Sequence, residues 1–179
     1  MTVPEYESPT GFTSVAGSDA RILILGSMPG IESLRQNQYY AHPRNCFWDL
    51  MGEMFAAGRV LPYPDRLLKL QQHHIALWDV AYQCERSGSL DSNIRAGSII
   101  ANDFTAFFAN HPGITAVFFN GRKASEIYQQ KVLLNLPEPF RSLPRQTLPS
   151  TSPAYAAMSR EEKLTRWLQF ISVADTVRP

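Results

Sequence analysis

The chain has 179 residues, of which 44% are hydrophobic and 18% are charged, and its net charge is +1 at neutral pH. This length suits one domain with a sizeable core, and the composition excludes a disordered, highly charged chain. The small net charge neither requires a nucleic-acid partner nor excludes one, because a local basic patch can bind nucleic acid without changing the total.

Residues 1–20 are rich in Pro, Gly, Ser and Thr without an apolar period, so we expect an irregular arm before a single domain over residues 21–179. Three short apolar runs then have the pattern of strands buried on both faces, and a shorter fourth candidate precedes Pro149. These strands cover residues 21–25, 75–80, 114–119 and 146–148. Helical patterns lie at residues 46–57, 65–72, 99–109 and 123–132. This alternation predicts an α/β fold, a three-layer α/β/α sandwich with a central four-stranded parallel sheet.

The last predicted helix begins after Ser159. Ser159 and Glu162 form a capping box, in which each side chain bonds a backbone N–H of the other residue. An apolar stripe at helical spacing follows and is expected to pack on the sheet. It consists of Leu164, Trp167, Leu168 and Ile171.

The segments that follow the predicted strands are the first candidates for function, because ligands of open parallel sheets bind outside the carboxyl ends of the strands. They are residues 26–30, 78–79, 120–123 and 148–154. The glycines of the first segment let backbone approach a ligand closely. This segment matches neither the dinucleotide glycine pattern nor a phosphate loop, and Ser27 does not stand in a nucleophile elbow.

Residues 38–48 combine aromatic rings, a basic residue and an amide. Such a loop suits a flat heterocycle that must be stacked and hydrogen-bonded at its edge. The alternative is that its aromatic residues belong to the core, and we accept this for Phe47 and Trp48. It does not account for Arg44 and Asn45 at the start of a predicted helix, although a plain N-cap role competes for Asn45.

Metal, disulfide and membrane features are not expected. Cys46 and Cys84 are too few for a disulfide framework or a four-thiolate cluster and should be reduced thiols. The adjacent His73 and His74 cannot share one face of an element, so we expect structural or surface histidines and neither metal nor cofactor. No apolar stretch approaches the roughly 20 residues that cross a bilayer, and the first residues lack a signal-peptide pattern, so we expect a cytoplasmic protein.

The strand-end segments resemble the motifs of the uracil-DNA glycosylase superfamily. Its first motif, a G-x-x-P-[GS] loop after the first strand, is matched by residues 26–30. In the mismatch-specific uracil and thymine glycosylases an aromatic-A-H-P-x-N-x-F-W segment follows, and residues 40–48 match it. The second motif, a Pro-Ser-rich loop after the last strand, is matched by residues 148–154. The resemblance runs roughly from Ile22 to the final helix and implies the same fold.

One position departs from the mismatch-specific enzymes, which have a catalytic asparagine where Met28 stands, because methionine cannot orient a water. The hypoxanthine-DNA glycosylase branch is similar in this respect, with G-S-x-P-[SG], a double tyrosine, H-P-x-N-x-F-W and F-N-G. Residues 26–30, 39–40, 42–48 and 119–121 match these pieces. The functional asparagines of that branch correspond to Asn45 and Asn120. The four-cysteine cluster of the iron–sulfur branches is missing.

The resemblance implies a base-excision repair glycosylase that hydrolyses the N-glycosidic bond of a deaminated base, hypoxanthine or uracil, flipped out of DNA. Asn45 would hold the water or support the transition state, and Asn120 would contact an edge of the base. Tyr40 would stack on the base, and Asp79 would contact the base or the sugar cation, with a loop-capping role as its equal alternative. The implied base pocket contains Gly26, Ser27, Met28, Pro29, Tyr40 and Asp79.

DNA contacts are expected around the same segments. Hydroxyls and backbone donors of residues 150–152 can bind phosphates, and Tyr155 or Ala154 can fill the gap left by a flipped nucleotide. Arg145 and other basic side chains are candidates for a local patch, although a solvated surface position is the ordinary place for each alone. The predicted DNA-binding set is His42, Arg44, Arg122, Lys123, Ser150, Thr151, Ser152 and Tyr155.

The expected reaction is simple hydrolysis that leaves an abasic site, because no lysine presents itself as an amine nucleophile. We expect a monomer whose partner is DNA containing a deaminated base. Two other classes of function stay open. One is a noncatalytic nucleic-acid binder with the same fold, which Met28 would allow, and the other is a small-molecule nucleotide hydrolase that uses the same aromatic segment.

Overall fold

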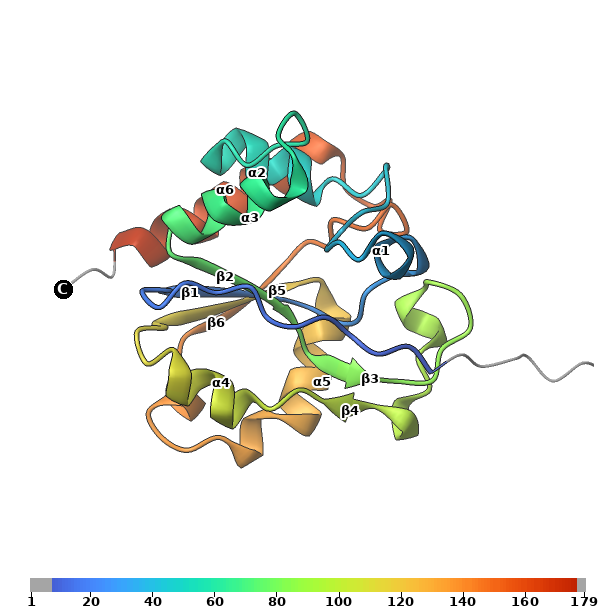
Figure 1. Cartoon of the computed structure of the whole chain (residues 1–179), viewed down its shortest axis with the longest axis vertical. Helices are drawn as coiled ribbons and strands as arrows, with labels where there is room; N and C mark the ends of the chain where they lie inside the picture. Colours follow the sequence, from blue (N-terminus) through green and yellow to red (C-terminus); the bar gives the residue numbers. More distant parts are fainter. Residues whose placement is uncertain (1–7, 177–179) are drawn as a thin grey trace, which may run out of the picture.

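The computed structural model describes residues 8–176 and contains a parallel sheet of four strands between helices (Figure 1). The strands are β1 (Ile22–Gly26), β2 (Ile75–Asp79), β5 (Ala116–Asn120) and β6 (Arg145–Leu148), in the order β2-β1-β5-β6. Every residue of β1, β2 and β5 is buried, because these mainly apolar runs are covered on both faces. The predicted three-layer sandwich around a four-stranded parallel sheet is confirmed.

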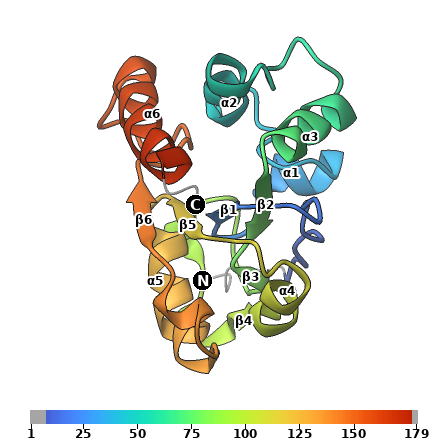
Figure 2. The same ribbon diagram turned by 90° about the vertical axis from the view of Figure 1, so that its left-hand side faces the viewer.

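Helices cover both faces of this sheet. The helices α2 (Phe47–Phe55), α3 (Tyr63–Gln72) and α6 (Arg160–Thr176) lie on one face, and α4 (Phe104–Asn110) and α5 (Arg122–Lys131) lie on the other (Figures 1 and 2). The helical patterns at residues 46–57, 65–72 and 123–132 correspond to α2, α3 and α5. Short elements were not predicted, because a single turn carries no readable period. They are α1 (Ile31–Gln36) and the 3-10 turns η1 (Asp91–Asn93), η2 (Ala96–Ser98), η3 (Leu133–Asn135) and η4 (Phe140–Ser142).

The prediction of one helix over residues 99–109 was wrong at its start. The strand β4 (Ile100–Ala101) pairs antiparallel with β3 (Ala81–Gln83), and α4 begins only after Asp103. The Asp103 carboxylate accepts a hydrogen bond from the backbone N–H of Ala106 at 2.9 Å, an N-cap that fixes where the helix starts. Pairing with β3, which is remote in sequence, therefore decides the conformation of residues 100 and 101.

The described part of the N-terminal arm, residues 8–20, lies against β2 and β3. Val15 exchanges two backbone hydrogen bonds with Leu77, of 2.9 and 2.8 Å, and Thr10 forms an isolated bridge with Gln83. Apart from these bridges, residues 8–20 contain no helix or strand. The arm thus covers the backbone at the outer edge of β2.

The capping box at the start of α6 is confirmed. The backbone N–H of Ser159 donates to the Glu162 carboxylate at 2.7 Å, and the N–H of Glu162 donates to the Ser159 hydroxyl at 3.1 Å. The predicted apolar stripe was wrong at Leu168, which is 46% exposed. The buried line instead joins Lys163, Trp167 and Ile171, which stand four residues apart on one helix face. In the described part of the chain, no helix is long and apolar enough to span a membrane.

Candidate active site

The carboxyl ends of the strands bring the predicted functional segments together. In the sheet register, Gly26 pairs with Asp79, and Asn120 pairs with Leu148. Because all four strands are parallel, the loops after β1 and β6 lie at the same end of the sheet, as the sequence predicted. The candidate site is therefore this end of the molecule.

The loop after β1 is packed tightly, and Gly26 is the residue that permits it. A Cβ added at Gly26 would collide first with Oδ1 of Asp79 and would lie 2.8 Å from the hydroxyl of Tyr40. The carbonyls of Gly26 and Ser27 accept hydrogen bonds from the backbone N–H groups of Val80 and Ala81, at 2.8 and 3.0 Å. Because Gly26 has no side chain, the Asp79 carboxyl and the Tyr40 hydroxyl can both lie next to its Cα.

Asp79 is a buried carboxyl, only 3% exposed, and its Oδ2 has no hydrogen-bond partner. Burial raises the pKa of Asp79 to about 7, the negative charge of Asp91 adds to the rise, and Arg86 opposes it. The alternative of a loop-capping carboxylate finds no support, because neither side-chain oxygen bonds a described backbone N–H. An unpaired buried oxygen of this kind favours a ligand donor as its partner.

Two charged residues that the sequence analysis missed stand behind Asp79. Asp91 accepts a hydrogen bond from the Ser27 hydroxyl at 2.6 Å, and its pKa is raised mainly by burial. The guanidinium of Arg86, whose residue is 2% exposed, donates to the Pro29 carbonyl at 2.6 Å, while its Nε and Nη1 have no hydrogen-bond partner. We call Ser27, Asp79, Arg86 and Asp91 the acidic side of the site. No sequence signal marked Arg86 or Asp91, because they lie in a polar, turn-rich segment that ordinarily faces solvent.

Tyr40 combines an unusual backbone with a stacked ring. Its φ of 53° lies in the left-handed region, and its ring stacks on Phe47 with centroids 4.1 Å apart. The Tyr40 hydroxyl is buried without a hydrogen-bond partner, and burial raises its pKa. Phe47 and Trp48 are fully buried, which confirms their interpretation as core residues.

Asn45 lies in the turn before α2, and its side chain bears on both roles considered for it, the N-cap of the helix and the positioning of a water. Its Oδ1 accepts a hydrogen bond from the backbone N–H of Phe47 at 3.0 Å, which holds the turn, but the N-cap residue of α2 is Cys46 and not Asn45. Its side-chain NH₂ group forms no hydrogen bond with the described residues. The carbonyl of Asn45 accepts a hydrogen bond from Arg59 at 2.6 Å, which fixes the turn from the other side.

Asn120 is joined to Thr151 by two hydrogen bonds. The Nδ2 group of Asn120 donates to the Thr151 hydroxyl at 2.8 Å, and its Oδ1 accepts from the Thr151 backbone N–H at 2.9 Å. Thr151 has no exposed surface, so the prediction that its hydroxyl binds phosphate does not fit this geometry. Gly121 follows Asn120 with a φ of 94°, and a Cβ added there would lie 3.0 Å from the Cβ of Ser150, so glycine suits this position. Asn120 therefore fastens the loop after β6 to the end of β5.

We call residues 149–155 the hydroxyl loop. The hydroxyl oxygens of Ser150 and Ser152 accept backbone hydrogen bonds from Ser152 and Ala154, each at 3.2 Å, so their O–H donors stay available. The Thr151 carbonyl accepts a hydrogen bond from the Cys46 backbone N–H at 3.1 Å, which ties this loop to the turn of Asn45. Tyr155 is 37% exposed at its far end. Asn45, Asn120 and the hydroxyl loop form what we call the amide side of the site.

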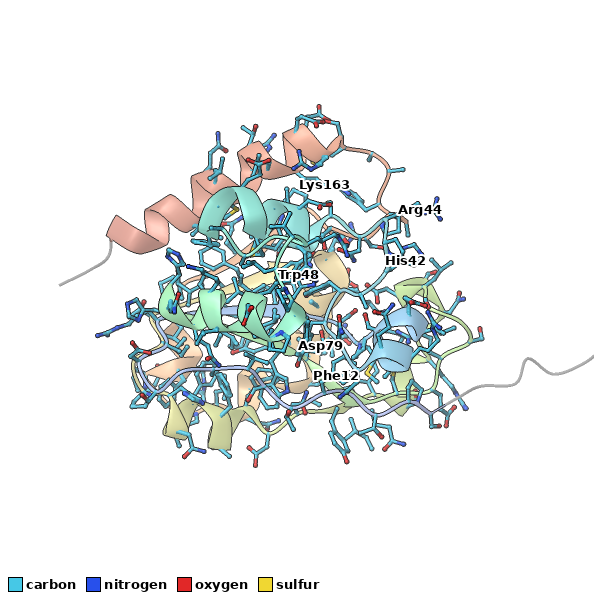
Figure 3. All side chains as sticks on the ribbon, turned by 45° about the horizontal axis from the view of Figure 1, so that its top comes forward. Phe12, His42, Arg44, Trp48, Asp79 and Lys163 are labelled. Carbon is cyan, nitrogen blue, oxygen red and sulfur yellow. The ribbon has the colours of Figure 1, made fainter. Side chains whose placement is uncertain are left out.

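The predicted basic residues lie around these two sides. Arg44 is exposed and extends outward from the loop before α2, beside His42 (Figure 3). His42 is partly buried, and its Nδ1 accepts a hydrogen bond from the Arg44 backbone N–H at 3.1 Å. Arg122, in the first turn of α5, pairs with Glu126 at 3.1 Å, and Lys123 beside it is partly buried. A hollow of about 530 Å³ lies elsewhere, between α4 and the β3–β4 pair, and Trp78 is the one residue of the candidate segments that lines it.

Comparison with known proteins agrees with this arrangement. A sequence model of the Uracil DNA glycosylase superfamily matches residues 13–172. This chain belongs to that superfamily. It is 37% identical over 134 residues to the hypoxanthine DNA glycosylase of Methanosarcina barkeri (strain Fusaro / DSM 804), covering 70% of this chain and 84% of the relative. It is 39% identical over 132 residues to the hypoxanthine DNA glycosylase of Methanosarcina acetivorans, covering 69% of this chain and 82% of the relative.

A solved structure is also similar. The solution NMR structure of a protein from Methanosarcina acetivorans, titled as a candidate uracil DNA glycosylase, matches with a TM-score of 0.76 and 34% identity. The match covers 94% of this chain and 99% of that one. As a member of the uracil DNA glycosylase superfamily, the chain is a DNA glycosylase that acts on DNA, the enzyme class that its sequence predicted.

Proposed function

We propose that this glycosylase is monofunctional and hydrolyses the N-glycosidic bond of hypoxanthine, and of uracil as a second substrate, flipped out of DNA. The observation that carries the proposal is the pairing of Tyr40 with Asp79 at Gly26. An aromatic ring beside a buried carboxyl oxygen without a partner suits a base, which offers a flat face for stacking and ring N–H groups at its edge. The relatives named hypoxanthine DNA glycosylase favour hypoxanthine as the first base to test.

On the acidic side, Asp79 serves the base or the sugar. Hypoxanthine and uracil each carry a ring N–H next to a carbonyl, and an ionised Asp79 accepts a hydrogen bond from it. The same negative charge favours the oxocarbenium-like sugar that forms as the bond to the base breaks. Burial raises the pKa of Asp79 most, the negative charge of Asp91 raises it further, and the positive charge of Arg86 lowers it.

On the amide side, Asn45 binds and orients the water that attacks the sugar. Its Oδ1 already holds the N–H of Phe47 and has a second lone pair, while its NH₂ donors are not used by the described residues. An amide held in this way orients a water without acting as a strong base. Asn120 acts beside it by fixing the hydroxyl loop, because both ends of its amide are bonded to Thr151.

The test is cleavage of labelled duplexes that contain hypoxanthine, uracil, xanthine or adenine, with abasic sites detected by alkaline strand breakage. We expect hypoxanthine to be released fastest and uracil more slowly. No strand breakage should occur without alkali, and borohydride should trap no enzyme–DNA adduct, because no amine nucleophile takes part. Duplex binding without abasic sites would identify a noncatalytic binder. Hydrolysis of free nucleosides but not of duplexes would identify a small-molecule hydrolase.

A further inference from the structure

Lys163 is a buried lysine that belongs to none of the sequence motifs. It lies on the inner face of α6, one turn before Trp167, and is only 5% exposed. In Figure 3 it lies between α6 and the chain that leads into this helix, the segment that contains the hydroxyl loop. Lysine is rarely buried to this degree without a partner of opposite charge.

The partners of Lys163 are carbonyls. Its ammonium donates to the carbonyl of Tyr155 at 2.9 Å and to that of Ser152 at 3.5 Å, and it lies 5.3 Å from the centroid of the Tyr155 ring. Among residues 8–176, no described carboxylate pairs with it. An ammonium has three donors, so the two carbonyls leave one unused. The folded protein therefore holds a cation behind the hydroxyl loop without its anion.

A cation in this place changes what the loop offers to DNA. Two loop carbonyls point inward at Lys163, and the ammonium offsets their negative ends, which would otherwise repel an anion. The Ser150 and Ser152 hydroxyls keep their O–H donors for an acceptor. A charge held in the protein interior is also screened less by water and salt than the charge of an exposed lysine.

We propose that Lys163 is a phosphate-binding cation of the DNA interface, whose missing counter-charge is a backbone phosphate seated on the hydroxyl loop. This inference rests on the proposed function and adds to it a residue outside the sequence motifs. The competing role is purely mechanical, with Lys163 holding the loop by its carbonyls and contributing no charge to binding. The two roles differ in how binding responds to salt, because only a charge contact releases counterions.

The test compares Lys163→Met with Lys131→Met. Methionine keeps much of the aliphatic stem and removes the charge, and Lys131 is an exposed lysine in the last turn of α5, which makes it a matched control. The dissociation constant for a hypoxanthine duplex and for an unmodified duplex is measured by fluorescence anisotropy over a series of NaCl concentrations. Cleavage is measured with saturating enzyme, and melting temperature without DNA.

For Lys163→Met, the slope of log affinity against log salt should become shallower by about 1. Affinity for both duplexes should fall by the same factor, roughly threefold to tenfold at low salt. Cleavage at saturating enzyme should fall less than affinity does. The melting temperature should change little, because relief of the buried charge opposes the loss of its carbonyl contacts. Lys131→Met should match the wild type in every measurement.

An unchanged salt slope with lower affinity would overturn the proposal and assign Lys163 the mechanical role. Failure of Lys163→Met to fold would overturn it as well, because an unpaired charge should not be essential to stability. Binding to the unmodified duplex requires no cleavage, so it tests Lys163 independently of the reaction. The proposed function would instead be contradicted by a wild-type protein that releases no base. If the wild-type protein cleaves hypoxanthine DNA but Lys163→Met has an unchanged salt slope, only the assignment of Lys163 is contradicted.

Discussion

The acidic side and the amide side of the site differ in how their buried polar groups are paired. On the acidic side, Asp79 Oδ2 and two guanidinium nitrogens of Arg86 are buried without hydrogen-bond partners. On the amide side, two hydrogen bonds join Asn120 to Thr151 and leave one N–H of the Asn120 amide unused, and the serine hydroxyls accept hydrogen bonds from backbone N–H groups of their own loop. The comparison indicates that buried groups of the acidic side lack partners, while on the amide side the loop is held in place and Asn45 and the serine hydroxyls keep donors for water and phosphate. Substitutions on the two sides should therefore fail in different ways.

The largest effect is expected at Asn45, the residue of the amide side that we assign to the water. Asn45→Ala should lower single-turnover cleavage of hypoxanthine DNA by roughly 10²-fold or more, the order seen when one preorganised polar group is removed. Lesion binding should change far less. Because Asn45 also bonds the N–H of Phe47, a stability loss of about 1 kcal/mol should accompany the change. Loss of stability with cleavage intact would leave Asn45 only a structural role in the turn before α2.

The next effect concerns Asp79 and pH. Its pKa of about 7 predicts that wild-type cleavage rises as pH increases through about 7, since the ionised form is the one that accepts the ring N–H. Asp79→Asn should be roughly thirtyfold slower above that pH, through loss of a hydrogen bond to a charged group, and its rate should no longer rise with pH. A pH–rate profile of both proteins measures this. An unchanged profile in the variant would mean that another group titrates.

The same carboxyl makes a prediction about stability. The folded pKa of about 7 exceeds the ordinary value of 3.8, so the folded protein binds more protons than the unfolded chain between these values. This group therefore lowers the free energy of unfolding as pH rises from about 4 to about 7, by at most about 1.4 kcal/mol per pH unit. Denaturant unfolding at several pH values should show a shallower fall for Asp79→Asn than for the wild type. Identical slopes would contradict the burial of an unpaired Asp79.

A smaller effect is expected at Asn120, which is hydrogen-bonded to Thr151, whereas Asp79 Oδ2 on the acidic side has no partner. Asn120→Ala should cost about 1–3 kcal/mol of stability by leaving Thr151 unpaired, and should slow cleavage about tenfold. The loss should be similar for hypoxanthine and uracil, because Asn120 acts through the hydroxyl loop. The sequence alone favoured an uneven loss, expected of a side chain that contacts the base. Rates on both substrates decide between the two roles.

The smallest effects belong to the serines of the hydroxyl loop. Ser150→Ala and Ser152→Ala should each raise the dissociation constant by about threefold, the value of one neutral hydrogen bond. Base preference should stay constant, because phosphate contacts carry no sequence information. Competition binding with hypoxanthine and uracil duplexes provides the measurement. Unchanged affinity with altered preference would make the loop a contact surface for the base.

Much of this site could be predicted because its residues follow strands whose sequences are recognisable as continuous apolar runs. A continuous apolar run such as residues 75–78 has few alternatives to a buried strand, so Asp79 was placed correctly at its end. Arg86, Asp91 and Lys163 could not be predicted, because their burial depends on partners remote in sequence. Nothing local distinguishes Lys163 from the exposed charges beside it in α6. The prediction of a helix at residues 100 and 101 was wrong for the same reason, because these residues form a strand only by pairing with β3.

The contact between Val15 and Leu77 has a practical consequence for anyone who shortens this protein. Leu77 lies on the outermost strand of the sheet, and its N–H and C=O are both occupied by Val15. A variant trimmed to begin at Ala20 would leave those groups bare on a straight apolar strand, which is a template for pairing with another chain. The opposite border, β6, carries the exposed polar residues Arg145, Gln146 and Thr147 and needs no such cover. Trimming should therefore produce self-association through one border of the sheet. It would also remove the carbonyls of Phe12 and Thr13, which accept hydrogen bonds from Trp78 and from the Tyr39 hydroxyl beside the site.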